Sequence, residues 1–299
     1  MRRQFVTQAA ERGRLRLGLL LAQGGQLAHQ QVDLALLRHF FVIPALALMI
    51  AACASKKEEE PYIEGTVDSL YNQGMDFLAE ERFTDAAQYF NEVERQHPYS
   101  VWATKAKLMS AYAQYQNNKY DDAVTALDRF IAVHPGNRDI AYAYYLKALC
   151  FYEQIADVQR DQTLTRKALD ALQEIVTRFP GTTYSRDARL KIDLTRDHLA
   201  GKEMAIGRFY ERRAQFLAAI NRFKVVVDQY GDTTHSPEAL ERLTESFMAL
   251  GLVDEARKTA AVLGYNYPGS DWYRDAYAIV EGKPMPAAAS GNKPWYRFW

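Results

Sequence analysis

The side chains best suited to acid–base, nucleophilic or metal chemistry are six histidines and two cysteines, and their spacing does not assemble a reaction site. His97 and His134 each stand directly before a proline, a position that recurs along the chain and favours a structural role. Cys150 lies in an apolar run and is expected to be a buried small side chain. The sequence contains no metalloprotease, serine-hydrolase or phosphate-loop motif. We therefore expect no catalytic residues, no metal, no cofactor and no enzymatic activity.

The other cysteine, Cys53, has surroundings that favour covalent modification. It follows the uncharged segment 40–52, which has the length of a signal-peptide apolar region rather than of a membrane-spanning helix. The sequence Ile50-Ala51-Ala52-Cys53 resembles a bacterial lipobox, whose cysteine sulfur receives a diacylglycerol and whose freed amine is then acylated, for example with palmitate. Several acyl chains together make a stable membrane anchor. The alternatives are an ordinary buried cysteine and a membrane span.

The region before the body is predicted to direct the protein to a membrane. Residues 1–52 are predicted to be a leader with a lipoprotein signal peptide, and residues 53–65 an acylated cysteine followed by a flexible, polar tether. Ala54 rather than aspartate follows the cysteine, which by resemblance to lipoprotein sorting rules favours the outer membrane. Segment 1–37 is long for such a leader. This length predicts a translation start near Val32 or Leu37, with an unusually long leader as the alternative.

The overall composition excludes several classes of protein. Lys and Arg number 37, as do Asp and Glu, so a strongly basic nucleic-acid binder is not expected. A hydrophobic content of 48% with 12% aromatics can fill a sizeable core, which argues against a wholly disordered chain. Two cysteines exclude a disulfide scaffold and a cysteine-rich zinc module.

The body of the chain repeats a helical pattern. An alanine is followed four and seven residues later by apolar side chains and twelve residues later by proline or glycine. A further residue, small in four cases, precedes this alanine by twelve positions, or by twenty in the third repeat. The pattern resembles the tetratricopeptide (TPR) repeat and predicts an all-α, superhelical solenoid of about five helix-turn-helix repeats over residues 66–281. The aligned alanines are Ala86, Ala123, Ala168, Ala219 and Ala256, and the earlier positions are Gly74, Ala111, Ala148, Gly207 and Thr244.

Repeats three and four are longer than the basic period. In repeat three the polar stretch 157–162 is predicted to be a loop between the paired helices. In repeat four, residues 184–213 are predicted to form one helix about 25 Å longer than its counterparts. A break at Gly201 into two helices is the alternative. Residues 282–299 are predicted to be a flexible tail, and its end, Trp295-Tyr296-Arg297-Phe298-Trp299, is either a docking peptide or a frayed terminus.

Two turns carry side chains suited to binding other polypeptides in the groove that stacked helix pairs create. Tyr99 and Trp102 stand between repeats one and two, where aromatic rings favour a wet binding surface. An arginine near the turn of repeat four could pair with a carboxylate of a partner. In both places the alternative is packing between neighbouring repeats or a solvated charge. The residues of the second place are Tyr210, Arg212, Arg213 and Arg222.

A lipobox, a short tether and five TPR-like repeats with extra residues in repeats three and four resemble the BamD family, the TPR lipoproteins of the outer-membrane β-barrel assembly (Bam) complex. The likeness covers about residues 53–277 and is strongest in 123–135 and 218–223. It implies a lipid-anchored scaffold on the periplasmic face of the outer membrane. Such a scaffold assists the folding and insertion of β-barrel proteins.

The resemblance also implies partners, namely the barrel-forming subunit through its periplasmic domains, other Bam lipoproteins and unfolded outer-membrane proteins, but no nucleic acid. By position, Tyr99 and Trp102 fall where the substrate targeting signal binds, although the turn 99–101 departs from the family's glycine- and proline-containing turn. Arg222 falls in the region facing the barrel subunit, and with Tyr210 and Arg213 it forms the predicted partner-binding site. The alternative function is a TPR lipoprotein adaptor for peptidoglycan synthesis or envelope division.

Overall fold

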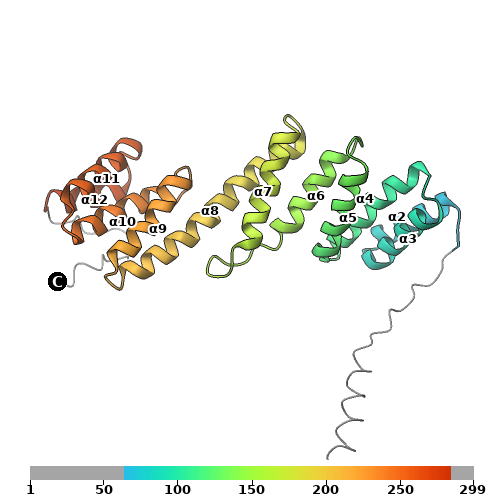
Figure 1. The fold of residues 1–299 in the computed structure, drawn as a ribbon, viewed down its shortest axis with the longest axis horizontal. Helices are drawn as coiled ribbons and strands as arrows, with labels where there is room; N and C mark the ends of the chain where they lie inside the picture. Colours follow the sequence, from blue (N-terminus) through green and yellow to red (C-terminus); the bar gives the residue numbers. More distant parts are fainter. Residues whose placement is uncertain (1–63, 284–299) are drawn as a thin grey trace, which may run out of the picture. The chain divides into compact units, whose positions relative to one another are not determined.

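The computed structural model describes residues 64–283, which form eleven α-helices and contain no strand (Figure 1). The leader, Cys53 and the aromatic tail therefore lie outside the described residues. The helices are α2 (Val67–Ala79), α3 (Phe83–Gln96), α4 (Val101–Gln116), α5 (Tyr120–Val133), α6 (Ile140–Tyr152), α7 (Thr163–Arg178), α8 (Thr183–Glu211), α9 (Phe216–Gln229), α10 (Ser236–Ala249), α11 (Val253–Asn266) and α12 (Asp271–Val280).

The first ten of these helices form five antiparallel pairs, from α2–α3 to α10–α11, which confirms the predicted all-α repeat fold. Each helix packs mainly against the helices next to it in the chain, as is typical of a solenoid. The last helix, α12, packs on α10 and α11 and covers the end of the fifth pair. The repeat pattern did not reveal α12 as a separate helix, because within the described residues no second helix follows α12 to complete a pair.

The positions that define the repeat pattern form the core. The five aligned alanines are fully buried, and so are the large side chains four residues later in the first four repeats. Gly74 and Gly207 show why the first helix of a pair needs a small residue. A Cβ atom at Gly74 would lie 2.8 Å from the Phe90 ring, and one at Gly207 would lie 2.3 Å from the Phe223 ring. The paired helices can therefore approach closely only over a glycine at these positions.

Proline ends the second helix of most repeats, as the sequence predicted. The residue before the proline leaves the helical region of backbone space, because the proline ring clashes with a preceding helical residue. Its φ lies between −125° and −135° and its ψ between 52° and 56° in all four cases. These residues are His97, His134, Phe179 and Tyr267.

Short turns join the two helices within a pair. In four repeats the turn contains one residue in the left-handed region, and only Gly251 among them is a glycine. Repeat three instead has the predicted loop, which spans residues 153–162. The side chain of Gln162 donates hydrogen bonds to the carbonyl oxygens of Asp157 and Arg160, and these bonds hold the loop against the start of α7.

Helix α8 is continuous over 29 residues, so the alternative of a break at Gly201 is wrong. The first helices of the other repeats have 13 to 16 residues, which makes α8 about 20 Å longer than the longest of them. Gly201 is buried, and a Cβ atom there would lie 3.1 Å from Nε2 of His235. The glycine thus allows a close approach of the chain before α10 and does not interrupt the helix.

Candidate binding surfaces

The first predicted site lies where α3 leads into α4. The hydroxyl of Ser100 accepts a hydrogen bond from the Trp102 amide at 3.1 Å and so caps α4 and fixes its first turn. Tyr99 is fully exposed, and the Trp102 ring packs at 4.8 Å from the ring of Tyr71 while 39% of the residue stays exposed. Val101 is also exposed. We call Tyr71, Tyr99, Val101 and Trp102 the N-terminal aromatic surface.

This surface combines apolar rings with one cation. Lys105 Nζ lies 5.0 Å from the centre of the Trp102 ring, within the range of a cation–π interaction. The Tyr71 ring in turn packs edge-on against buried Phe90, and burial raises the pKa of the Tyr71 hydroxyl. An aromatic or aliphatic side chain can therefore bind on Trp102 next to a positive charge. The sequence did not indicate Tyr71, because only the pairing of α2 with α4 brings it to Trp102.

The second predicted site is a groove of about 650 Å³ beside the turn between α8 and α9. Of the three residues predicted to bind a partner here, Tyr210 and Arg222 both line it. Arg213 does not line this groove, and its guanidinium instead lies 4.2 Å from the centre of the Phe209 ring. We call this the repeat-four groove. Its other main lining residues are Lys202, Arg208, Phe209 and Arg212.

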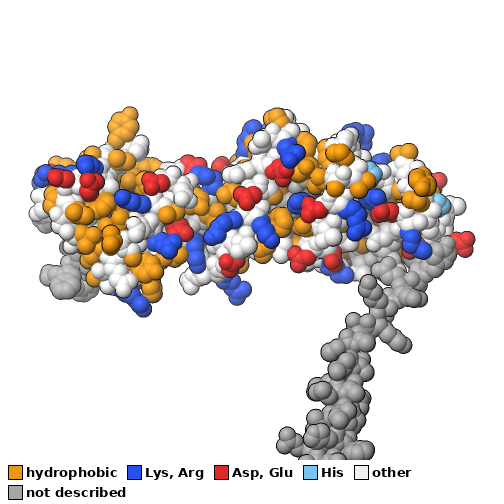
Figure 2. Space-filling view, in the orientation of Figure 1, with side chains coloured by type: hydrophobic (Ala, Val, Ile, Leu, Met, Phe, Trp, Pro, Cys, Tyr) orange, Lys and Arg blue, Asp and Glu red, His pale blue; other side chains and the backbone are white. Residues whose placement is uncertain are grey.

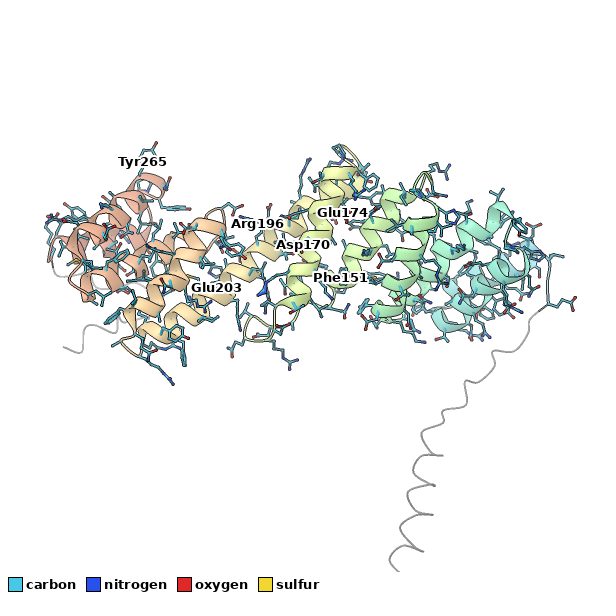
Figure 3. The ribbon with its side chains drawn as sticks, in the orientation of Figure 1. Phe151, Asp170, Glu174, Arg196, Glu203 and Tyr265 are labelled. Carbon is cyan, nitrogen blue, oxygen red and sulfur yellow. The ribbon has the colours of Figure 1, made fainter. Side chains whose placement is uncertain are left out.

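The repeat-four groove is basic, and no acidic residue is among those that line it in the described chain. Arg222 pairs with Glu203 of α8 at 3.1 Å, and Arg208 pairs with Glu238 of α10 at 2.8 Å; Glu203 is labelled in Figure 3. Within residues 64–283, Arg212 makes no ion pair. On the face seen in Figure 2, by contrast, basic and acidic side chains are interspersed. The groove therefore carries a local excess of positive charge, and its guanidinium groups are suited to carboxylates.

A buried group of charges, which the sequence did not indicate, lies next to this groove. Arg242 of α10 is within 3.0 to 3.7 Å of four glutamates and is itself largely buried. Burial and the neighbouring carboxylates raise the pKa of Glu211 to about 8, and burial also raises the pKa of Glu245. We call these residues the Arg242 cluster; its glutamates are Glu211, Glu238, Glu241 and Glu245.

The Arg242 cluster supports the groove through one shared residue. Glu238 accepts hydrogen bonds from Arg208 of the groove and also lies 3.5 Å from Arg242. On sequence alone, charges at these spacings on α10 are typical of a solvated helix face. Only the packing of α10 on its neighbours shows that most of them are buried.

The side chains with reactive potential in the described chain have structural surroundings. Cys150 is buried as predicted, and burial raises the pKa of its thiol to about 12, so it stays protonated. His97 contacts the carbonyl oxygen of Gly65 at 3.0 Å, and His134 packs on Phe130. Within residues 64–283, no three His, Cys, Asp or Glu side chains are placed so that they could hold a metal ion, and no helix has the length and apolar composition of a membrane span.

Taken together, these features define an all-helical TPR-type repeat protein with an exposed aromatic surface and a basic groove. Residues 64–263 match the outer membrane lipoprotein family YfiO. The chain is 48% identical to the outer membrane protein assembly factor BamD of Caulobacter vibrioides, over 83% of this chain and 84% of that one. It is also 48% identical to the assembly factor BamD of Rickettsia prowazekii, over 79% of this chain and 94% of that one. The chain belongs to the BamD family of outer membrane protein assembly factors.

A solved TPR protein is also similar in part. A thermophilic TPR protein of Thermus thermophilus is 18% identical to this chain, with a TM-score of 0.35. That alignment covers 72% of this chain and 99% of the solved one.

Proposed function

We propose that this protein is a subunit of the Bam complex and assists the assembly of β-barrel proteins into the outer membrane. The observation that carries this function is the identity of 48% to two curated assembly factors over about four fifths of the chain. The fold fits the role, because stacked helix pairs offer several separate surfaces along one scaffold. An adaptor for peptidoglycan synthesis or envelope division has no comparable support.

The test is a pull-down of the tagged full-length protein from detergent-solubilised outer membranes, with mass spectrometry of its partners. We expect to recover a large barrel protein with repeated periplasmic domains, at a stoichiometry near one-to-one with the tagged protein, together with other Bam lipoproteins. Recovery of cell-wall enzymes without that barrel protein would contradict the proposed function.

The protein is further proposed to reach the membrane through lipid attached to Cys53. This proposal rests on the lipobox in the sequence, because Cys53 lies outside the described residues. Mass spectrometry of the mature N-terminal peptide should show an acylated cysteine, and Cys53→Ser should release the protein from the membrane fraction. An unmodified thiol at Cys53 in the wild-type protein would contradict the anchor.

The repeat-four groove is the proposed contact for the barrel subunit. Its arginines suit a partner segment with carboxylates, and Phe209 and Tyr210 supply apolar contact. Arg222→Glu should weaken co-purification of the barrel subunit at least tenfold, since it reverses a charge in the groove. Because a new carboxylate would also face Glu203, Arg222→Gln serves as a second variant with a smaller loss in the same direction.

The matched control for this contact is Arg257→Glu, which reverses an exposed charge on α11 outside the groove. Arg257→Glu should leave co-purification unchanged. Equal recovery of the barrel subunit with Arg222→Glu and with wild type would remove the groove from the interface.

The N-terminal aromatic surface is the proposed site for targeting signals of unfolded outer-membrane proteins. Support comes from the half-exposed Trp102, the fully exposed Tyr99 and the nearby Lys105, which together suit a strand that ends in an aromatic residue. The double variant Tyr99→Ala/Trp102→Ala should weaken binding of such a peptide at least fivefold, measured by fluorescence anisotropy. Tyr265→Ala, at an exposed tyrosine of α11, is the control. Unchanged affinity in the double variant would exclude this surface.

A further inference from the structure

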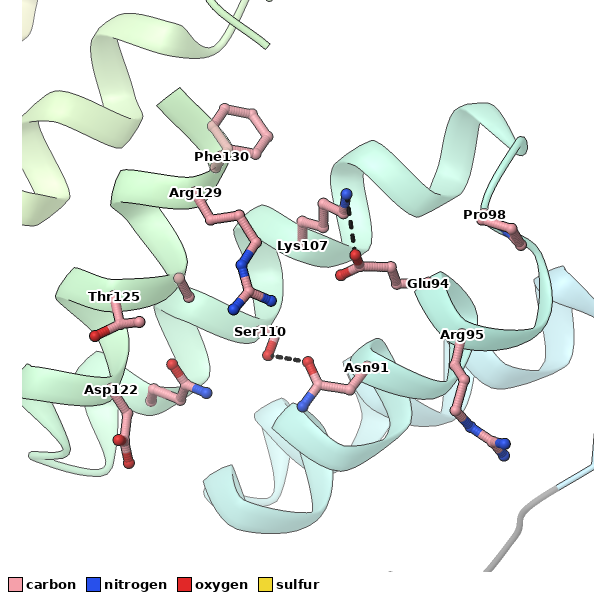
Figure 4. Close-up of a pocket in the computed structure, with 12 residues that line it drawn as sticks. Asn91, Glu94, Arg95, Pro98, Lys107, Ser110, Asp122, Thr125, Arg129 and Phe130 are labelled. Atoms are coloured by element: carbon pink, nitrogen blue, oxygen red, sulfur yellow. Dashed lines mark hydrogen bonds and ion pairs between the residues drawn. The ribbon is translucent and has the colours of Figure 1, made fainter. Parts of the chain in front are cut away.

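Besides the repeat-four groove, the structure has a groove in the N-terminal repeats, to which the function proposed above assigns no role. It has a volume of about 590 Å³ and lies between α3 and α5, with α4 at its floor (Figure 4). The residues of α4 that line it, among them Lys107 and Ser110, differ from Trp102, which packs on Tyr71 of α2. The groove is thus distinct from the N-terminal aromatic surface.

Helix α5 gives this groove a negative end and a positive end. Asp122 and Arg129 both line it and are seven residues apart, which is about two helical turns. They therefore lie on nearly the same face of α5, about 10 Å apart along its axis. Thr125 and Ala126 line the groove between them. In Figure 4 the Arg129 side chain extends from α5 across the groove toward α4.

Neither of these two charges is neutralised within the described part of the chain. Asp122 and Arg129 take part in none of the ion pairs or side-chain hydrogen bonds formed by residues 64–283. The other cations that line the groove do have acidic partners. Lys107 pairs with Glu94 at 3.0 Å, and Arg95 pairs with Glu92 at 2.6 Å. Among the described residues, the charges of the groove without a partner are thus one carboxylate and one guanidinium, on residues about 10 Å apart along α5.

We propose that this groove binds an extended segment of a partner polypeptide that carries one acidic and one basic side chain about three residues apart. An extended chain rises by about 3.3 Å per residue, so three residues span the separation of about 10 Å along α5. The acidic side chain of the segment accepts hydrogen bonds from the Arg129 guanidinium, which can bind a carboxylate with two parallel N–H groups. The basic side chain of the segment pairs with Asp122.

The middle of the groove suits the backbone of such a segment. Asn91, Ser110 and Gln114 line it with amide and hydroxyl groups that can bind peptide N–H and C=O groups. The Ser110 hydroxyl already donates to Asn91 Oδ1 at 2.7 Å, which fixes the orientation of that side-chain amide. Exposed Pro98 adds apolar contact for the intervening side chains, whereas the Phe130 ring, which also borders the groove, is buried in the core. A polar groove with an apolar part is typical of sites that hold extended peptides.

The test measures binding of four fluorescent, end-blocked octapeptides to the full-length protein in detergent by anisotropy. The peptides consist of serine and valine apart from two positions three residues apart. These two positions hold glutamate and lysine, two glutamates, two lysines or two serines. We expect the peptide with one glutamate and one lysine to bind at least tenfold more tightly than the other three. Equal affinity for all four peptides, or no binding of any, would overturn the proposal.

Charge exchange in the protein provides the sharper test. Arg129→Glu alone and Asp122→Lys alone should each reduce the affinity for the mixed-charge peptide at least tenfold, since each leaves two like charges in the groove. The double variant Asp122→Lys/Arg129→Glu should restore it, because the peptide can bind in the opposite direction. Both positions are exposed, and circular dichroism checks that the variants fold. Failure of the double variant to recover binding would overturn the proposal, and none of these results depends on Bam subunits.

Discussion

The first and the fourth repeat each bury a glutamate beside an arginine, but the pKa values of the two carboxyl groups are shifted in opposite directions. Burial acts to raise the pKa of Glu92, but hydrogen bonds from Arg95 and Gln96 outweigh it and lower the pKa below its ordinary value. Glu211 shares Arg242 with three other glutamates, and its pKa is raised to about 8. The comparison shows that the balance between burial and the hydrogen bonds and charges around a carboxyl group decides the direction in which its pKa shifts.

The same contrast extends to the surfaces of these regions. The N-terminal repeats present aromatic rings next to a groove with one unmatched charge of each sign. The fourth repeat presents a basic groove supported by buried charge. Because both regions share the same core pattern, their different surfaces come from residues outside that pattern. Substitutions at the buried charges and at the contacts between paired helices can test how far the two regions differ in stability and in its pH dependence.

The largest effect is expected from Arg242→Ala. It removes the cation of the Arg242 cluster and leaves Glu211, Glu241 and Glu245 without it in a buried site, while Glu238 keeps Arg208; this should lower the free energy of unfolding by about 3–5 kcal/mol. Urea denaturation followed by circular dichroism measures this loss. Arg82→Ala is the control in the first repeat, since the ion pairs of Arg82 with Glu80 and Asp85 are exposed. The urea midpoint of this variant should stay near that of wild type. A similar midpoint for the two variants would show that the cluster is not a distinctive feature of the C-terminal repeats.

A smaller effect is expected where the paired helices touch. In Gly207→Ala the new methyl group would lie 2.3 Å from the Phe223 ring, and in Gly74→Ala it would lie 2.8 Å from the Phe90 ring. Overpacking costs about 1–3 kcal/mol, and the better helix propensity of alanine offsets about 1 kcal/mol of it. Thermal unfolding should therefore show a larger loss for Gly207→Ala than for Gly74→Ala. Gly136→Ala, where a methyl group meets no atom within 4 Å, is the control. The reverse order would contradict the closer contact in repeat four.

The smallest effect is a difference in pH dependence. Glu211 binds its proton more tightly in the folded protein than in the unfolded chain, so its contribution to stability is present below about pH 4.5 and is lost as the pH rises to about 8. Glu211→Gln should flatten the decrease in melting temperature between pH 5 and pH 8.5. The contribution of Glu92 to stability has the opposite pH dependence. Because its pKa is lower in the folded protein than in the unfolded chain, this contribution is present at a pH above the unfolded pKa and is lost as the pH falls through the folded pKa. Glu92→Gln should therefore change the acid range only. An unchanged slope above pH 5 in Glu211→Gln would show that Glu211 is ionised in the fold.

Much of the scaffold could be predicted from the sequence because the repeat pattern is local. The small residue, the large residue and the closing proline recur at helical spacings, and each acts within one helix pair. The same reasoning predicted the loop at 157–162 and the long helix of repeat four. The sequence left open whether Gly201 breaks that helix, since a glycine weakens a helix but also permits close packing. The contact of Gly201 with His235, 34 residues later, resolves the question in the structure.

The candidate sites could be predicted only in part. Position in the repeat placed Tyr210 and Arg222 at one groove, but the pairing of Arg222 with Glu203 depends on how α9 packs on α8. Helix spacing determines which side chains share a face, and so the sequence by itself determined the repeats, the core and the general place of the binding turns. Tertiary structure decided which charged faces became buried, as in the Arg242 cluster, and which charges have no partner within residues 64–283, as at Asp122 and Arg129. The physical reason is that desolvation and ion pairing depend on contacts between helices, which no single helix pattern contains.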